Sequence, residues 1–156
     1  MKIIKNFRHV GIVTQDLNKS LWFYKKLLGL KIKTRMYEYG ATTEKLVNVK
    51  NAKINTVKLF NNKNSILIEL LHFKNVKKSK NINYNIKRTG CSHFAITVND
   101  IDNIYKRLSK YKIKFLSKPT LSNDKNVKLA FCRAPEGTLI EMVEEKNNKW
   151  KTKLLL

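Results

Sequence analysis

The feature that most restricts what this chain can fold into is an internal repeat. Residues 8–17 (RHVGIVTQDL) align without a gap with residues 92–101 (SHFAITVNDI), at an offset of 84. Residues 65–71 (SILIELL) align in the same way with residues 137–143 (GTLIEMV), at an offset of 72. The chain therefore contains two copies of one folding unit. Because the offsets differ by 12, the first copy is 12 residues longer between its matched segments.

The hydrophobic pattern of the first copy predicts one strand, one helix and three further strands. Asp16 is suited to begin the helix and Gly29 to end it. We expect strands at 7–14, 30–38, 54–60 and 65–73 and a helix at 17–28. The Thr-, Asn- and Lys-rich stretch 39–53 is expected to form a loop, which accounts for the extra length of this copy.

The second copy predicts the same order of elements. We expect strands at 91–98, 112–116, 127–133 and 138–144 and a helix at 101–110. The fold class is therefore α+β, with two tandem βαβββ modules in a single domain that spans residues 1–156. The expected division is module 1 at about residues 3–73, a basic linker at about 74–89, module 2 at about 90–145 and a C-terminal tail at 146–156.

Strand alternation places one histidine and one glutamate of each copy on equivalent faces. In the first copy, the aliphatic side of the strand around Ile68 is expected to pack on the helix, so His9 and Glu69 point to the other side. In the second copy, His93 and Glu141 have the same placement. A carboxylate among apolar residues is costly unless it is paired or bound to a metal. Each of the four alone is readily explained as structural, but their repetition at equivalent positions favours a common cause.

The chain is strongly basic: 33 Lys and Arg stand against 11 Asp and Glu in 156 residues, a formal net charge of +22. A basic surface is typical of nucleic-acid-binding proteins, but most of these cations are lysines, whereas proteins that read base edges rely on arginine. We therefore predict no nucleic-acid partner. The lysines are expected to be a surface background that helps to attract an anionic small-molecule substrate.

No apolar run is long enough to span a membrane, and the first residues lack the apolar core of a signal peptide. We therefore expect no membrane partner and a cytoplasmic location. Cys91 and Cys132 form no CxxC motif and are too few for a disulfide framework, so both are expected to be reduced apolar fillers. His72 follows Glu69 at odd spacing and is expected at the surface or at a sheet edge.

The motifs of both copies, taken in order, resemble the vicinal oxygen chelate superfamily over about residues 7–144. This superfamily includes glyoxalase I, methylmalonyl-CoA epimerase, extradiol dioxygenases and bleomycin resistance proteins. The motifs are HVGIV followed by DL, then FY and LGL, LIELL, SHFAI followed by VNDI, and PEGTLIE. The resemblance implies that the two modules form an open, curled β-sheet cleft, and that the protein is a homodimer.

The resemblance also implies a divalent metal ion, Fe, Ni, Co, Mn or Zn, held by His9, Glu69, His93 and Glu141. Two imidazoles and two carboxylates suit such metals and leave room for a bidentate substrate. Glu141 is the first candidate for the catalytic base.

The longer hairpin of the first copy holds the second candidates for a base. Epimerases of the family place an additional acid in this region, which singles out Glu44 and, less strongly, Glu38.

The function implied is that of a metal-dependent lyase or isomerase, like glyoxalase I or methylmalonyl-CoA epimerase. The metal would chelate vicinal oxygens of a small substrate and stabilise an enediolate or enolate. Two alternatives remain open: an Fe(II)-dependent ring-cleaving dioxygenase, and a non-catalytic ligand-binding protein of the bleomycin-resistance type. Polyanion binding is a fourth possibility, and it predicts steep dependence on salt.

Overall fold

The structure is a computed structural model that describes residues 3–62, 66–75, 85–87 and 89–146. Its contacts divide the chain into two compact units, Met1–Asn81 and Ile82–Leu156, and each unit is described by itself. Most of the predicted linker and nearly all of the predicted tail lie outside the described residues. In the described part of the chain, no helix is long and apolar enough to cross a membrane.

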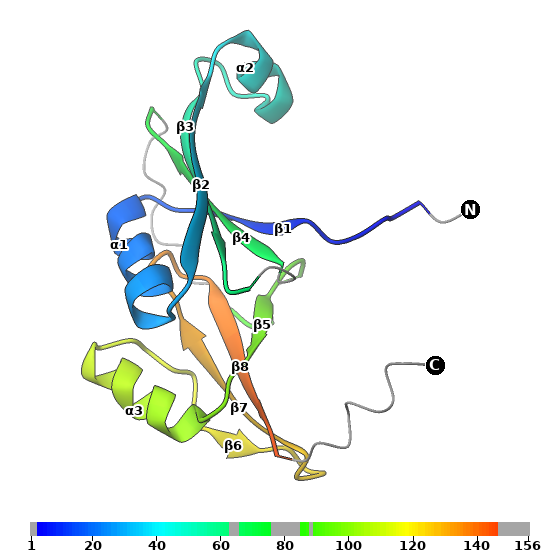
Figure 1. The fold of residues 1–156 in the computed structure, drawn as a ribbon, viewed down its shortest axis with the longest axis vertical. Helices are drawn as coiled ribbons and strands as arrows, with labels where there is room; N and C mark the ends of the chain where they lie inside the picture. The colour runs from blue at the N-terminus through cyan, green and yellow to red at the C-terminus, as the bar shows by residue number, and fades with distance from the viewer. Residues whose placement is uncertain (1–2, 63–65, 76–84, 88, 147–156) are drawn as a thin grey trace. The chain divides into compact units, whose positions relative to one another are not determined.

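Unit 1 contains a mixed four-stranded sheet in the order β1-β4-β3-β2 (Figure 1). The strands are β1 (His9–Val13), β2 (Lys31–Tyr39), β3 (Lys53–Phe60) and β4 (Leu67–Phe73). β1 runs parallel to β4, and the other neighbouring strands are antiparallel. All four predicted strands are thus confirmed, with small differences at their ends.

A helical segment packs on this sheet. It consists of α1 (Leu17–Leu21) and the π-helix η1 (Trp22–Leu27). The Asp16 carboxylate accepts a hydrogen bond from the backbone N–H of Lys19 at 2.9 Å, and Gly29, with φ of 78°, follows the end of the segment. Phe23 and Tyr24 are fully buried and meet edge to face, with ring centroids 5.1 Å apart. The predicted helix at 17–28 is therefore in place, although its second half is a π-helix.

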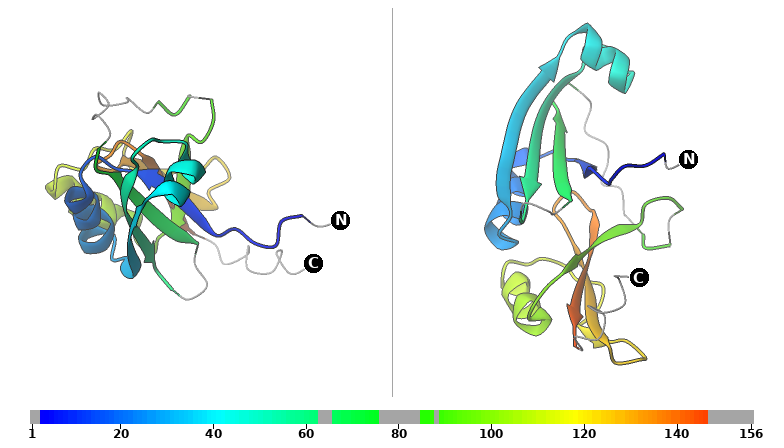
Figure 2. Two further views of the ribbon diagram at one scale, coloured as in Figure 1. Left: turned by 90° about the horizontal axis from the view of Figure 1, so that it is seen from above. Right: turned by 45° about the vertical axis from the view of Figure 1, so that its right-hand side comes forward.

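The prediction of a loop at 39–53 is wrong over residues 41–47. Helix α2 (Ala41–Val47) occupies this stretch, at the tip of the long β2–β3 hairpin (Figure 2). Gly40, with φ of 87°, turns the chain out of β2, and Asn48, with φ of 51°, ends the helix in a left-handed conformation. Ala, Glu, Lys and Leu have high helix propensities, which explains why a stretch rich in polar residues is helical here.

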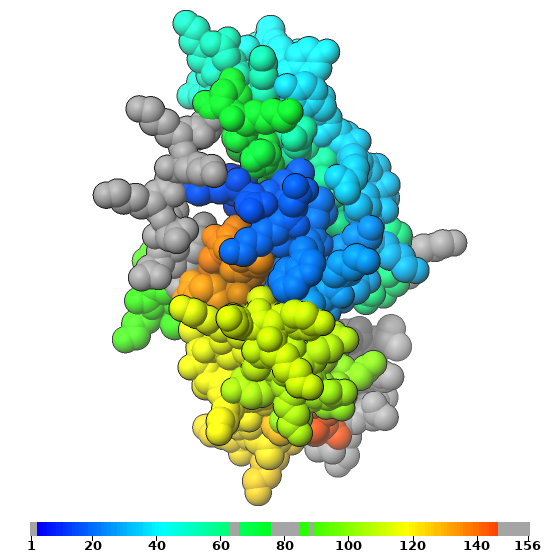
Figure 3. Space-filling view, turned by 90° about the vertical axis from the view of Figure 1, so that its left-hand side faces the viewer, coloured from blue at the N-terminus to red at the C-terminus, as the bar shows by residue number. Residues whose placement is uncertain are grey.

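Unit 2 repeats the architecture with the sheet order β5-β8-β7-β6. Its elements are β5 (His93–Thr97), α3 (Ile101–Lys110), β6 (Thr120–Leu121), β7 (Val127–Arg133) and β8 (Leu139–Glu145). β5 runs parallel to β8, as β1 does to β4. Helix α3 faces the viewer in Figure 3.

The predicted strand at 112–116 is wrong: this stretch makes only one isolated bridge, between Phe115 and Cys132. Lys112 has a left-handed φ of 59°, which delays the return to extended backbone. Pro119 lacks an N–H and breaks the ladder before the short strand β6 begins at Thr120. The second module therefore has a much shorter outer strand than the first.

The predicted alternation of faces is confirmed on the two central strands. Ile68 and Leu70 of β4, and Ile140 and Met142 of β8, are buried at 8% exposure or less. The α+β class and the two βαβββ modules are therefore as expected. Each sheet by itself is open and uncurled, because its two outer strands leave unpaired edges. The curled cleft shared by both modules was inferred from the family fold, and that part stays a prediction.

Candidate functional site

Unit 1 brings His9 and Glu69 together on its sheet. The distance from His9 Nε2 to Glu69 Oε2 is 3.1 Å, and the Glu69 side chain is only 12% exposed. The other carboxylate oxygen, Oε1, lies 3.2 Å from Lys58 Nζ, on the neighbouring strand β3. Lys58 is directly opposite Glu69 in the β3–β4 register, which explains the contact. Glu69 is therefore shared between an imidazole and an ammonium group.

Unit 2 builds the equivalent pair with different neighbours. His93 Nε2 lies 3.3 Å from Glu141 Oε2, and the Ser92 hydroxyl lies 2.8 Å from the other ring nitrogen of His93, Nδ1. Phe131 is directly opposite Glu141 in the β7–β8 register and meets the His93 ring edge to face, with centroids 5.2 Å apart. Because a hydroxyl can donate or accept, Ser92 can hold His93 in either tautomer.

The parallel strand register explains why each histidine meets its glutamate. In unit 1, Gly11 is the register partner of Glu69, and in unit 2 Ala95 is the partner of Glu141. Each histidine lies two residues before that small residue, on the same side of its strand. A small side chain between them leaves space for the imidazole to reach the carboxylate.

The donor atoms of each pair have a spacing that fits a shared metal ion. Two ligands bound at about 2.1 Å in an octahedral or tetrahedral shell lie about 3.0 to 3.4 Å apart. The measured separations, 3.1 and 3.3 Å, fall in this range. Within either unit, the described residues form no group of three or more His, Cys, Asp or Glu side chains able to hold a metal. The ligand set of the prediction joins both pairs, and this joint site stays a prediction.

Glu44, the second candidate for a base, lies on α2. This helix is at the tip of the β2–β3 hairpin, and β2 is at the opposite edge of the sheet from β1. Glu38 lies on β2, on the same face as Glu69, and accepts a hydrogen bond from the hydroxyl of the buried Thr56. Within the sheet, Glu38 is therefore better placed than Glu44 to act on that face, but the role of each stays a prediction.

The two cysteines and His72 have structural surroundings. Cys132 is fully buried, and burial raises the pKa of its thiol to about 12, so the thiol is unreactive in the folded protein. Cys91 is exposed. His72 is half-buried, and its Nδ1 is buried with no hydrogen-bond partner among the described residues. His72 points away from Glu69, as expected from its odd spacing, because residue 72 shares the face of the buried Leu70. It is half-buried there rather than at the surface.

Sequence reasoning missed the residues that surround the first pair. A cavity of about 370 Å³ opens on this sheet, lined by Asn6, Phe7, Arg8, Lys33, Thr34, Met36, Lys58 and Leu67. Lys58 lines this cavity and also contacts Glu69 of the His9–Glu69 pair. The signal in the sequence was a lysine inside an otherwise apolar stretch of β3, but only the strand register places it opposite Glu69.

Two tandem βαβββ modules, each with a His–Glu pair at the same register, define the architectural class of this chain. A model of the glyoxalase/bleomycin resistance protein/dioxygenase superfamily matches residues 6–142. The chain therefore belongs to this superfamily, which confirms the resemblance to the vicinal oxygen chelate proteins. A comparison with curated proteins found no significant match.

Solved structures support the same fold. A glyoxalase family protein from Bacillus cereus has a TM-score of 0.83 at 20% identity, over 94% of this chain and 97% of that one. A trypanothione-dependent glyoxalase I from Leishmania major has a TM-score of 0.68 at 22% identity, over 97% and 94%. A V278E mutant of glyoxalase I from Zea mays has a TM-score of 0.62 at 17% identity, over 88% and 43%. At these identities the likeness concerns the fold alone.

Proposed function

We propose that this protein is a divalent-metal-dependent lyase or isomerase of the glyoxalase type. The observation that carries the proposal is the twofold repetition of one His–Glu pair, with donor atoms 3.1 and 3.3 Å apart. A single pair of this kind is commonly structural. Two pairs at the same register of two modules, each spaced as ligands of one ion are spaced, favour metal binding. Glyoxalase I proteins among the similar folds favour lyase or isomerase chemistry.

In this proposal His9, Glu69, His93 and Glu141 hold the ion. When bound, the metal supplies a Lewis acid that stabilises negative charge on substrate oxygens. The two glutamates are not equivalent. Lys58 contacts Oε1 of Glu69, which keeps this carboxylate oriented. Glu141 contacts only His93 among the residues for which a contact is described, so it is the carboxylate freer to accept a proton from the substrate.

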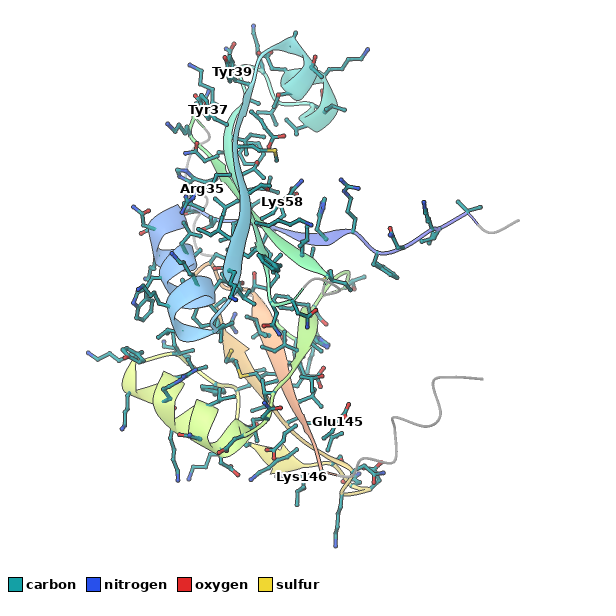
Figure 4. All side chains as sticks on the ribbon, in the orientation of Figure 1. Arg35, Tyr37, Tyr39, Lys58, Glu145 and Lys146 are labelled. Carbon is teal, nitrogen blue, oxygen red and sulfur yellow. The ribbon has the colours of Figure 1, made fainter. Side chains whose placement is uncertain are left out.

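The first test is metal content. The protein, purified and loaded with Ni²⁺ or Zn²⁺, is expected to retain one ion per set of four ligands, that is, one ion for each chain. The variants His9→Ala and Glu141→Gln are each expected to lose it. Glu145→Gln is the matched control, because Glu145 is an exposed glutamate four residues further along the same strand (Figure 4). Stoichiometric metal that persists in both site variants would contradict the proposed ligands.

The second test is the reaction. The loaded protein is expected to convert the adduct of methylglyoxal and a small thiol, or to exchange the proton beside a carbonyl with solvent deuterium, without taking up oxygen. Oxygen uptake with catechols would favour the dioxygenase alternative instead. Glu141→Gln is expected to abolish turnover, whereas Glu44→Gln would abolish it only if the second candidate is the base.

A further inference from the structure

We propose that module 1 carries a binding subsite for a small organic anion, whose carboxylate or phosphate group is held by the cations around the cavity beside His9 and Glu69. That the bound anion is part of the substrate rests on the proposed function. That an anion binds here does not depend on the metal or on turnover.

The charge of the cavity is one-sided. Its lining includes the cations Arg8, Lys33 and Lys58 and no acidic residue. Arg8 and Lys33 make no ion pair with any residue that the structure describes, and the carboxylate nearest to Lys58 is Glu69, at 3.2 Å. Three cations therefore border a space in which one carboxylate offsets only part of their charge, so an anionic ligand is favoured there.

Lys58 links this cavity to the proposed metal ligands. Its side chain is 20% exposed and projects from the face of the sheet opposite to Arg35, Tyr37 and Tyr39 (Figure 4). An ammonium group has three N–H donors, and the contact with Glu69 uses one. Lys58 can therefore donate to a bound anion without releasing Glu69. The anionic group of a ligand at Lys58 would lie next to the His9–Glu69 pair.

The cavity size and its apolar wall define the rest of the ligand. The volume of about 370 Å³ lies near the lower end of the range of small-molecule sites, about 300 to 1,000 Å³, which suits a small organic ligand. Phe7 and Met36 line the cavity with 80% and 39% of their surface exposed. An anion with a compact apolar body would cover these side chains as well as meet the cations.

Module 2 provides an internal control for the abundance of lysine in this chain. Its His–Glu pair has Ser92 and Phe131 where module 1 has Arg8 and Lys58. If the cations around His9 were only part of the basic background, the same background could equally surround His93. Instead, the contacts described for the second pair are with a hydroxyl and an aromatic ring. One cation, Arg133 on β7, shares that face of the sheet, but its guanidinium donates to the Gly137 carbonyl. Among the described residues, a cation in contact with the His–Glu pair is thus a property of module 1.

The test is calorimetric titration of the full-length protein with benzoate and phenyl phosphate, and with benzamide as the uncharged counterpart. We expect at least one anion to bind, with affinity that falls as salt is raised, and benzamide to bind at least about tenfold more weakly. Lys58→Gln, Arg8→Gln and Lys33→Gln are each expected to weaken anion binding about ten- to a hundredfold, the usual worth of a charge-assisted hydrogen bond. Lys53→Gln, on the same strand but the opposite face, is the matched control and is expected to bind as the parent does.

Arg8 and Lys33 are exposed, so their variants test the subsite even if Lys58→Gln fails to fold. Preference for benzoate or for phenyl phosphate identifies the anionic group, and either supports the subsite. Binding of neither anion, equal binding of benzamide, or an equal loss in Lys53→Gln would overturn it. Titrations are run with and without bound metal. If the protein binds anions but never retains a metal, the proposed function is wrong and the subsite stands. If it retains a metal but binds no anion, the subsite is wrong and the proposed function stands.

Discussion

The two modules of this chain hold the same pair of functional groups in different surroundings. In module 1, Glu69 is shared between His9 and Lys58, beside a cavity bordered by cations. In module 2, the ring of His93 is held between the Ser92 hydroxyl and the edge of Phe131. The strand register that brings each His to its Glu is the same in both. The backbone thus determines the pair, and the residues beside it determine what the pair can bind.

The cores of the modules differ in the same way. In module 1, the hydroxyls of the buried Thr14 and Ser20 hydrogen-bond to each other at 2.8 Å. The repeat aligns these two residues with Val98 and Ile104 of module 2. Module 1 therefore buries a hydrogen-bonded polar pair at two positions where module 2 has half-buried aliphatic side chains. A single architecture tolerates both solutions because each buried hydroxyl has a partner.

The largest expected effect is in thiol labelling, which contrasts two thiols of module 2 and can be extended to module 1. Cys132 lies in the core of module 2, where the register of module 1 has Leu59. At pH 8, a thiol with a pKa of about 12 has about a thousandfold less thiolate than one at the ordinary value of 9.0. We expect a thiol reagent to modify the exposed Cys91 at once and Cys132 only when module 2 opens. Labelling of Leu59→Cys would then report on module 1.

The same thiol predicts a dependence of stability on pH. Burial raises the pKa of Cys132, so the folded state favours the protonated thiol. This contribution to stability is complete below pH 9.0 and is lost as pH rises from 9.0 toward about 12. Urea unfolding is expected to show a steeper loss of stability above pH 9 in the parent than in Cys132→Val. Equal slopes in the two proteins would contradict the buried, protonated thiol.

Neutralising each glutamate should separate the two sites. Without metal, Glu69→Gln leaves the half-buried Lys58 with no carboxylate in contact, so we expect a loss of about 1 to 2 kcal/mol in unfolding free energy. Glu141→Gln removes no ammonium partner, so its cost is expected to be below about 1 kcal/mol. Urea unfolding in EDTA at pH 8 measures both. Equal losses of unfolding free energy in the two variants would mean that the contact between Lys58 and Glu69 contributes no stability.

Helix caps offer a smaller contrast. Asp16 and Asp100 accept hydrogen bonds from Lys19 and Asn103 at 2.9 and 3.0 Å. Only α3 has a second carboxylate, that of Glu144, which accepts a hydrogen bond from the Ile101 N–H at 3.1 Å.

Asp16→Ala is therefore expected to cost about 1 kcal/mol of unfolding free energy and Asp100→Ala about half of that, because Glu144 remains and a like-charge repulsion is relieved. Urea unfolding of the two variants side by side measures the difference. A larger cost for Asp100→Ala would contradict the compensating role of Glu144.

The smallest effect is expected from Gly11→Ala, which copies Ala95 of module 2 into module 1. An added Cβ would lie 3.6 Å from Leu71 Cδ1 and 4.0 Å from Glu69 Oε2, which are ordinary contacts. We expect a change in stability within about 0.5 kcal/mol and unchanged metal retention. A loss of metal in this variant would mean that module 1 does not tolerate the Cβ that module 2 has at Ala95. The two sites would then differ in backbone geometry as well as in their neighbouring side chains.

The sequence was informative where a pattern is local and repeated. Alternation along the strands was sufficient to place His9 and Glu69 on one face, because successive side chains of any strand point to opposite sides. It failed at 41–47 and 112–116, where a polar stretch is helical and an apolar stretch is interrupted. In both places a left-handed residue or a proline redirects the backbone, and alternation carries no information about such turns.

By itself, then, the sequence determined the two βαβββ modules, the family and the four repeated His and Glu residues. Only the tertiary structure decided that Lys58 faces Glu69 while Phe131 faces Glu141. The reason is that contacts within a strand follow from its own sequence, whereas contacts between strands depend on register, which is set by the packing of the whole sheet. The cationic cavity of module 1, assembled from four separate parts of the chain, is visible only at that level.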